Sequence, residues 1–225
     1  NSKNIDISFS NILGRSLSNV KGVVQSSYSG YGLYSDSVSF RNCYIGNSNS
    51  GRPSNGFYFG PEGNGIAQNW EIENCTITGF TEIGIMMETG YYTRIENTEI
   101  YLTEPSSKNK VVGIKMTHSV YSTRILRNKI HSLTSSNLAT NQIIGIEIPF
   151  SSYHSIYNNF ISLAGNEYSE VTGIDYSGSY SSNDNIINNT IYIYGSSINE
   201  QNSYCFRRRP FQSYAGLSVR LKNNI

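Results

Sequence analysis

The feature that most constrains this chain is a pattern that recurs about every thirty residues. Each copy opens with a glycine and alternating apolar residues, and the starts lie at Gly56, Gly84, Gly113, Gly145 and Gly173. A second signature has asparagine two or three residues before a closing isoleucine, at Ile45, Ile77, Ile100, Ile130, Ile161, Ile191 and Ile225. In the last four glycine copies, 16 to 18 residues separate the glycine from its isoleucine, whereas 7 to 15 residues lead on to the next glycine. One side of the repeat is therefore fixed, and the other accepts loops of different length.

The apolar residues within each copy alternate, as in Ile114/Met116 and Ile146/Ile148, which indicates short β-strands rather than helices. One copy of about thirty residues cannot bury its apolar face alone, but copies stacked about 4.8 Å apart form a continuous core. We therefore predict an all-β solenoid of about seven coils, roughly 30 residues per coil, in a single domain over residues 1–225.

Asparagine recurs where a strand must end in a corner, and it tolerates left-handed backbone angles better than most residues. We predict a structural ladder in which amides hydrogen-bond along the stack, in preference to a ligand role. Its predicted members are Asn42, Asn74, Asn97, Asn128, Asn158 and Asn188. In the double asparagines, one residue is expected to point inward and the other to form the turn.

Three segments resemble right-handed parallel β-helix repeats (PbH1-like) of large secreted or cell-surface proteins of Bacteroidetes-type bacteria. These segments are IYNNFISL, NIINNTIYI and NSYCFRR…LKNNI. The resemblance implies the right-handed coil and an extracellular or cell-surface location. It leaves the activity open, because the same fold serves polysaccharide lyases, phage tailspikes and adhesins. The last copy, LKNNI, has no evident cap, so we expect the chain to be a fragment of a longer one.

Composition excludes several classes of partner. The formal net charge is +1 and only 15% of residues are charged, so no basic field indicates nucleic-acid binding. No apolar run reaches about 18 residues and the start lacks the pattern of a signal peptide, so we expect neither a membrane span nor a leader. Cys43, Cys75 and Cys205 form no CxxC pair and are expected to be buried free thiols. The three histidines, His118 among them, are scattered, so no metal site is predicted.

Aligning the glycine starts gives a column two residues later: Tyr58, Met86, Lys115, Glu147 and Asp175. This column should point away from the core because its neighbours point inward. Lyases of similar architecture place acidic residues around calcium and use a basic residue to remove a proton, so Lys115, Glu147 and Asp175 are catalytic candidates by resemblance. We favour the alternative, which is charge pairing between adjacent strands with Lys115 beside Glu147.

A second column, eight residues after the glycine, contains Tyr92, Tyr121 and Tyr153, with Tyr180 one position early. Outward tyrosines of this kind can lie against sugar faces, or can stack on one another and stiffen the corner. Arg94 and Arg124 lie close to the strip and could pair with acidic sugars or with Glu96.

The densest positive cluster is Arg207 to Arg209, followed by Pro210. It is interpreted as a solvated face, with contact to a polyanion as the alternative.

Together these patterns favour a noncatalytic extracellular or cell-surface solenoid module, structural or adhesive, that contacts glycans or joins a filamentous assembly by end-to-end self-association. The alternative is a polysaccharide lyase or hydrolase of the parallel β-helix type, and calcium is expected only in that case. No other cofactor is predicted.

Overall fold

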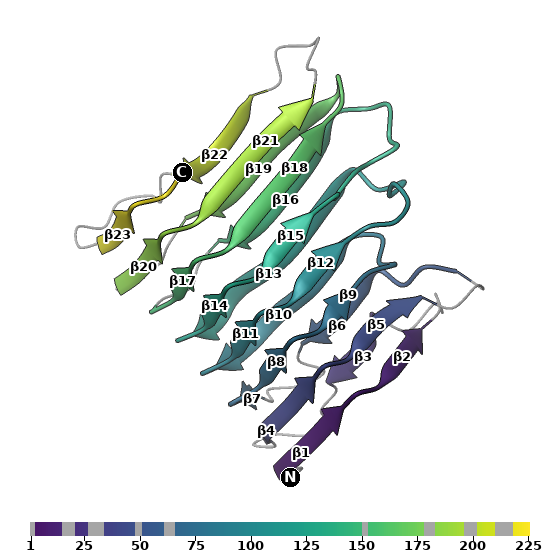
Figure 1. The fold of residues 1–225 in the computed structure, drawn as a ribbon, viewed down its shortest axis with the longest axis vertical. Coiled ribbons are helices and arrows are strands. Elements are labelled where there is room, and N and C mark those ends of the chain that lie inside the picture. The colour runs from purple at the N-terminus through teal and green to yellow at the C-terminus, as the bar shows by residue number, and fades with distance from the viewer. Residues whose placement is uncertain are drawn as a thin grey trace.

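The computed structural model describes residues 3–14, 21–26, 34–47, 51–60, 66–149, 153–177, 183–195, 202–209 and 218–225. Within these residues the chain is all β, without helices, and strands from successive repeats pair in parallel to form a solenoid (Figure 1). The described residues include no helix long and apolar enough to cross a membrane.

Each coil has three faces. The first face contains β3 (Gly22–Ser26), β6 (Asn55–Phe59), β10 (Ile83–Tyr91), β13 (Lys110–Tyr121), β16 (Asn141–Ile148), β19 (Ser169–Tyr176) and β22 (Ser203–Arg208). The second contains β1 (Lys3–Ser8), β4 (Tyr34–Arg41), β8 (Glu71–Glu73), β11 (Arg94–Glu96), β14 (Arg124–Leu126), β17 (Ser155–Tyr157), β20 (Asn183–Ile187) and β23 (Ser218–Lys222). With β7 (Ile66–Gln68), which pairs with both β4 and β10, these two faces form one 16-stranded sheet.

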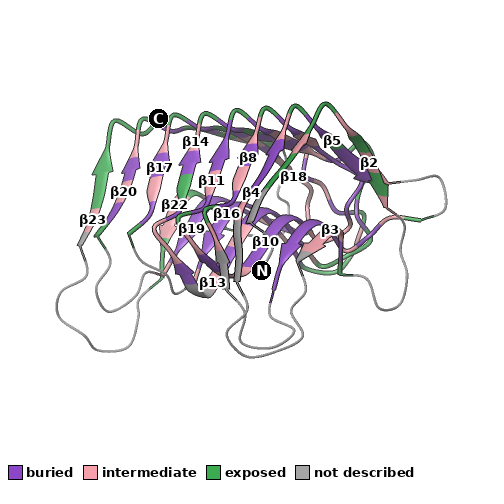
Figure 2. Ribbon diagram, turned by 90° about the horizontal axis from the view of Figure 1, so that it is seen from below, coloured by how far each residue is buried: buried purple, intermediate pink, exposed green. Residues whose placement is uncertain are grey.

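The third face is a separate seven-stranded sheet. It contains β2 (Asn11–Gly14), β5 (Tyr44–Asn47), β9 (Thr76–Ile77), β12 (Glu99–Tyr101), β15 (Lys129–His131), β18 (Phe160–Gly165) and β21 (Thr190–Gly195). On the second and third faces the middle residue of each short strand points inward, as the predicted alternation requires, and Ile95, Ile125 and Ile130 are fully buried. Buried segments recur in the strands of successive coils (Figure 2).

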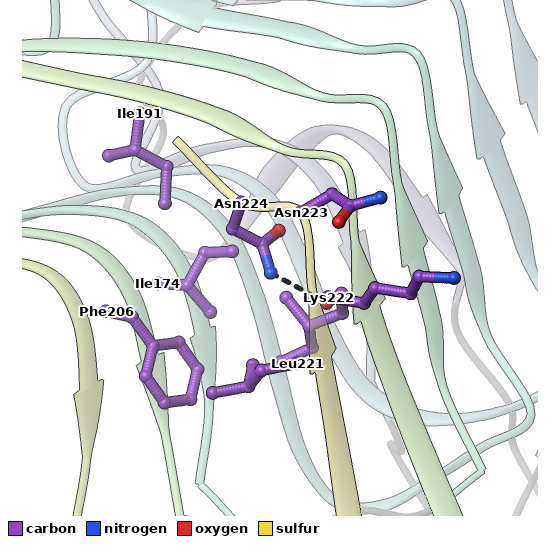
Figure 3. A pocket seen from close by; sticks show the side chains of 8 residues that line it. Ile174, Ile191, Phe206, Leu221, Lys222, Asn223 and Asn224 are labelled. Atoms are coloured by element: carbon purple, nitrogen blue, oxygen red, sulfur yellow. Dashed lines mark hydrogen bonds between the residues drawn. The ribbon is translucent and has the colours of Figure 1, made fainter.

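The solenoid has about five coils of about 30 residues, not the seven predicted. The prediction counted closing isoleucines, and Ile45 and Ile225 lie outside the five glycine-start repeats. The described strands of those outer segments extend the three faces at the two ends of the solenoid. At the C-terminal end a cavity of about 320 Å³ opens between Ile174, Phe206 and Leu221 (Figure 3).

The opening glycines are explained by close packing between coils. A Cβ atom at Gly145 would lie 2.5 Å from the carbonyl oxygen of Gly173 and 2.7 Å from Cγ2 of Ile161. Gly84 and Gly113 have the same relation to the next coil, at 2.6 Å from its glycine carbonyl oxygen. No side chain fits there, so glycine is needed for contact rather than for an unusual backbone angle.

The corner between the second and third faces uses two consecutive positions. The first has a left-handed backbone, with φ between 48° and 55°, at Asn42, Asn74, Asn97, Arg127, Asn158, Asn188 and Asn223. The second points inward and continues the stack at Cys43, Cys75, Thr98, Asn128, Asn159, Asn189 and Asn224. Each pair of asparagines therefore has one turn-forming and one inward residue.

The amide ladder lies one position further along the chain than predicted, except at Asn128. The backbone N–H of Asn128 donates to Oδ1 of Asn159 at 2.9 Å, and that of Asn159 donates to Oδ1 of Asn189 at 3.0 Å. Asn159 Nδ2 also donates to the carbonyl oxygen of Ile125, at 2.9 Å. The other predicted members, Asn42, Asn74, Asn97, Asn158 and Asn188, are exposed turn residues, because the left-handed angle directs their side chains outward.

The cysteines partly follow the prediction. Cys43 and Cys75 are free and buried at the inward position of the corner. Burial raises the pKa of the Cys75 thiol to about 11. Cys205 is also free but is exposed, contrary to prediction, because it lies on β22, where no described strand covers the outer side.

Candidate functional site

A groove follows the corner between the first and second faces. Its larger part, about 570 Å³, is lined by Asn69, Glu71, Tyr92, Arg94, Ser122, Arg124, Tyr153 and Ser155. A second hollow of about 320 Å³ shares Asn69 and Glu71 and continues to Ser39, Arg41 and Asp6. The two hollows together run along the solenoid axis across successive coils.

Strand register places the groove residues in two rows. On the second face the outward row runs through Glu71, Arg94, Arg124 and Ser155, which are paired in that order between neighbouring strands. The residue after each of them is a buried isoleucine, so the strand alternation fixes the outward direction of this row. The second row is the corner itself.

The corner row has left-handed backbone angles, with φ of 52° at Asn69, 58° at Tyr92, 54° at Ser122 and 64° at Tyr153. Asparagine accepts such angles more readily than most residues, whereas a bulky aromatic residue seldom adopts them. Tyr92 and Tyr153 are nevertheless 63% and 48% exposed, so burial does not compensate for the strained backbone.

Four of the five predicted ligand-binding residues lie together in this groove: Tyr92, Tyr153, Arg94 and Arg124. Tyr121 does not line it. The pairing of β10 with β13 shifts between Met87 and Thr89, so that Tyr121 lies opposite Tyr91 instead of Tyr92. The rings of Tyr91 and Tyr121 stack at 5.2 Å, and Ser122 takes the corner position. Tyr180 lies outside the described residues.

The arginines of the groove differ in their partners. Arg94 contacts the buried carboxylate of Glu96, which Arg127 also contacts, and lies 3.9 Å from Glu71. Arg41 binds Glu71 at 2.6 Å and Asp6 at 3.2 Å. Arg124 is exposed, and its side chain has neither an ion pair nor a hydrogen bond to any residue that the structure describes. Among the described residues, its guanidinium is therefore a charge without an acidic partner in the centre of the groove.

The predicted charged column is in register on the first face: Met86, Lys115, Glu147 and Asp175 are paired strand to strand. Glu147 is 8% exposed and lies 2.5 Å from Nζ of Lys110 and 3.5 Å from Nζ of Lys115. The ion pair between Lys115 and Glu147 is the one expected from charge pairing.

Asp175 is held by the arginine cluster. Arg207 donates to its Oδ2 at 2.6 Å and Arg209 to its Oδ1 at 2.9 Å. Burial raises the pKa of Asp175, the hydrogen bonds from Arg209 and Arg207 lower it, and the net shift is downward. Arg207 also binds Glu170 at 2.6 Å, so within the cluster only Arg208 is exposed without an acidic partner among the described residues. Pro210 and the side chain of His118 lie outside the described residues.

A buried polar corner was not predicted. His154 follows the corner residue Tyr153, Asp184 lies at the equivalent position of the next coil, and both side chains are buried. The N–H of His154 donates to Oδ1 of Asp184 at 2.6 Å, and the hydroxyl of Tyr176 donates to Oδ2 at 2.7 Å. Burial lowers the pKa of His154 to about 3 and raises that of Asp184 to about 6. Thr123, His154 and Asp184 lie at the same position in successive coils, and the backbone N–H of each of the first two donates to the side chain of the next. The recurrence of a polar residue at this position is the sequence signal that could have revealed the cluster.

Aromatic residues on the outer third face were also missed. The rings of Tyr101 and His131 stack at 5.1 Å, and those of Tyr192 and Tyr194 at 5.3 Å. They lie one or three positions after the buried isoleucine, which is the alternation that could have identified them. Within the described part of the chain, no three histidine, cysteine or acidic residues are grouped so that they could hold a metal ion.

Comparison with known proteins gives no match: no protein-family model, no curated protein and no solved structure is similar to this chain at the level required for a match.

Proposed function

We propose that this chain is a noncatalytic solenoid module of the cell exterior or cell surface, which holds a glycan along the groove beside Tyr92, Arg124 and Tyr153. The observation that carries the proposal is the groove itself, in which exposed tyrosines and a guanidinium that no described residue pairs with line a hollow that follows the solenoid axis. Amphipathic rings of this kind offer a flat apolar face and a polar edge to a sugar.

The scaffold suits a linear ligand. Successive coils repeat the same corner about every 4.8 Å, so a chain molecule lying along the groove would meet an equivalent backbone at each step. The rows are positioned by parallel strands whose central residues are fully buried, so the outward side chains start from a rigid base. This geometry supports a structural or adhesive role in which no reaction takes place.

The location and the hand of the coil are part of the same proposal. The exterior location is supported by the resemblance of the repeats to those of secreted and surface proteins. The right hand is supported by the general rule that connections between parallel strands of one sheet are right-handed.

The alternative is a polysaccharide lyase or hydrolase. It is favoured by the adjacency of Lys115, Glu147 and Asp175 on three successive strands, and calcium would be expected only in this case. Against it, each of these three side chains has an ion-pair partner, and Asp175 has two arginines. The column also lies on the first face, away from the larger groove.

End-to-end self-association is supported by one feature, the open apolar end where Leu221 is 49% exposed. A second copy with β1 stacked on β23 would extend the second face. Glycan contact has the stronger support, because several exposed side chains line the groove whereas a single feature indicates self-association.

The test is a binding assay with neutral and acidic polysaccharides, in which newly formed chain ends are counted in the same samples, with and without calcium. We expect binding without new ends, and weaker binding by Tyr92→Ala and Tyr153→Ala than by the control Tyr192→Ala. Tyr192 is 59% exposed but lies on the third face, so its loss should not matter. New ends that disappear in Lys115→Ala would establish the lyase instead, and no binding to any polysaccharide would reject the proposal.

A further inference from the structure

We infer that the centre of the groove binds an anionic sugar unit, with a carboxylate or sulfate on Arg124 and the sugar ring in the space between Tyr92 and Tyr153. This inference rests on the proposed function and specifies the chemical class of the glycan. It comes from three observations: the charge balance along the groove, the spacing of its tyrosines and the strain in their backbone.

The charge balance singles out one arginine. Arg41 and Arg94 both contact acidic side chains of neighbouring strands, Glu71 among them, so their charges are already balanced. Arg124 follows Arg94 in the same outward row but faces Ser155 on the next strand, which carries no charge. The row thus leaves one guanidinium able to form a bidentate pair with two oxygens of a carboxylate or a sulfate, the geometry that arginine provides and lysine does not.

The spacing fits one ring. Tyr92 and Tyr153 occupy the same corner in coils separated by one intervening coil, that of Ser122 and Arg124. Their backbones are therefore roughly 9.6 Å apart, twice the strand spacing. Stacked rings lie about 4.5 Å or more apart, so the space between the two tyrosines matches the thickness of a single ring. Small Ser122 leaves this space open, with Arg124 on the same coil.

The strained backbone of Tyr92 and Tyr153 supports a role for their side chains in ligand contact. Equivalent corners are made by Ser37, Asn69 and Ser122, whose side chains are small and polar and favour turns. Tyrosine at this conformation is unfavourable, and side chains this exposed gain little burial in return. Strained residues of this kind gather at ligand sites.

The groove favours a sugar over an acidic peptide. Acidic peptides are typically bound by clusters of arginines, whereas in this groove Arg94 is already paired with acidic side chains and Arg124 alone lacks an acidic partner among the described lining residues. Here the lining is mainly polar, with serines, asparagine and charged groups around two exposed rings. A hydroxyl-rich ring that carries an acid matches this lining at its edges and its faces.

The experiment titrates the protein with three soluble oligosaccharides of equal length: a polyuronate, a sulfated glycan and a neutral glucan. We expect the polyuronate or the sulfated glycan to bind more tightly than the neutral glucan, with affinity that falls as salt rises. Arg124→Ala should weaken the anionic ligand about tenfold or more, and Arg124→Lys should recover only part of that loss. The control is Arg220→Ala, an exposed arginine of the same outward row that lies outside the groove, which should change affinity less than about twofold.

Each other result has a defined meaning. A neutral glucan that binds as tightly as the charged ones, with unchanged affinity in Arg124→Ala, overturns the inference and leaves the proposed function standing. Failure of all three glycans to bind rejects the proposed function and, with it, the inference. A polyglutamate peptide that binds as tightly as the polyuronate and depends equally on Arg124 would show that the site recognises charge alone, which overturns the assignment to sugars. Comparing the polyuronate with the sulfated glycan identifies the source of the anion.

Discussion

Asn159 connects three coils through its side chain and its backbone N–H. Its Oδ1 accepts the N–H of Asn128, its Nδ2 donates to the carbonyl oxygen of Ile125, and its own N–H donates to Oδ1 of Asn189. All of these groups are buried, so removing the amide leaves polar groups without water or a partner. Its neighbour Asn158 is exposed and contributes the left-handed turn.

We therefore predict different costs for leucine at the two positions. Asn159→Leu should lower the free energy of unfolding by about 2–4 kcal/mol, since at least two buried backbone groups lose their partners. Asn158→Leu should lower it by about 1–2 kcal/mol, because a branched side chain is poorly tolerated at positive φ. Urea denaturation of both variants measures the difference. A larger loss at Asn158 would mean that the ladder assignment is wrong.

Asp184 predicts a pH dependence. Its folded pKa of about 6 lies above its ordinary value of 3.8, because burial disfavours the charged carboxylate. Its contribution to stability is therefore fully present below about pH 4 and is lost as the pH rises through about 6. In the variant Asp184→Asn, the side-chain amide could still accept the N–H of His154 but would not ionise.

The difference in unfolding free energy, Asp184→Asn minus wild type, should accordingly grow by about 1–3 kcal/mol between pH 4 and pH 7. His154, with its pKa lowered to about 3, also affects stability in this range, and because it is present in both proteins its contribution cancels in the difference. Urea denaturation at four pH values gives the comparison. A difference that stays constant with pH would show that Asp184 is not desolvated as the structure indicates.

At the scale of the elements, the loop between β15 and β16 contains positions that should accept an insertion and positions that should not. Leu138 is 77% exposed, whereas Ser135 is 5% exposed, bridges to Ser106 and donates to the carbonyl oxygen of Lys108 at 2.8 Å. A Gly-Ser insertion after Leu138 should therefore cost less than about 1 kcal/mol, the usual cost of a longer loop. The same insertion after Tyr157 should prevent cooperative unfolding or lower the melting temperature sharply, since it shifts Asn158 and Asn159 out of register. Thermal melts followed by circular dichroism test the pair, and equal tolerance would contradict the register.

The strands and their stacking could be predicted from the sequence, but their exact register could not. The repeat period, the inward isoleucines and the glycine starts predicted the strands and their parallel stacking, because these residues face the same constraint in every coil. The extra residue in β13 could not be seen, because a register shift depends on pairing with β10, and it moved Tyr121 out of the groove. The sequence also could not show which asparagine of each pair points inward. The two residues are the same type, and they differ only in their backbone angle, which is known from the structure. The groove brought together Tyr92, Tyr153, Arg94 and Arg124, but the free charge of Arg124 depends on partners that only the fold reveals.

At the scale of the whole molecule, stability should vary along the axis. Each coil contacts only its neighbours, so the end segments have one stacking interface and the central coils have two. The same inward column illustrates this gradient, because Ile125 in its middle is fully buried whereas Leu221 at its C-terminal end is 49% exposed beside an open cavity. The strands at the two ends also include more exposed residues than those of the centre (Figure 2).

We predict that amide hydrogen exchange will be slowest in β10, β13 and β16 and fastest in β1, β2 and β23, because end coils can open without disturbing the rest. In step with this, Ile125→Ala should lower the free energy of unfolding by about 2–5 kcal/mol and accelerate exchange across several coils. Leu221→Ala should cost less than about 1 kcal/mol and accelerate exchange only in β22 and β23. Exchange measured by mass spectrometry on the wild type and both variants resolves these segments. Uniform protection from β1 to β23 would contradict this prediction, because it would mean that the whole solenoid opens as a single cooperative unit.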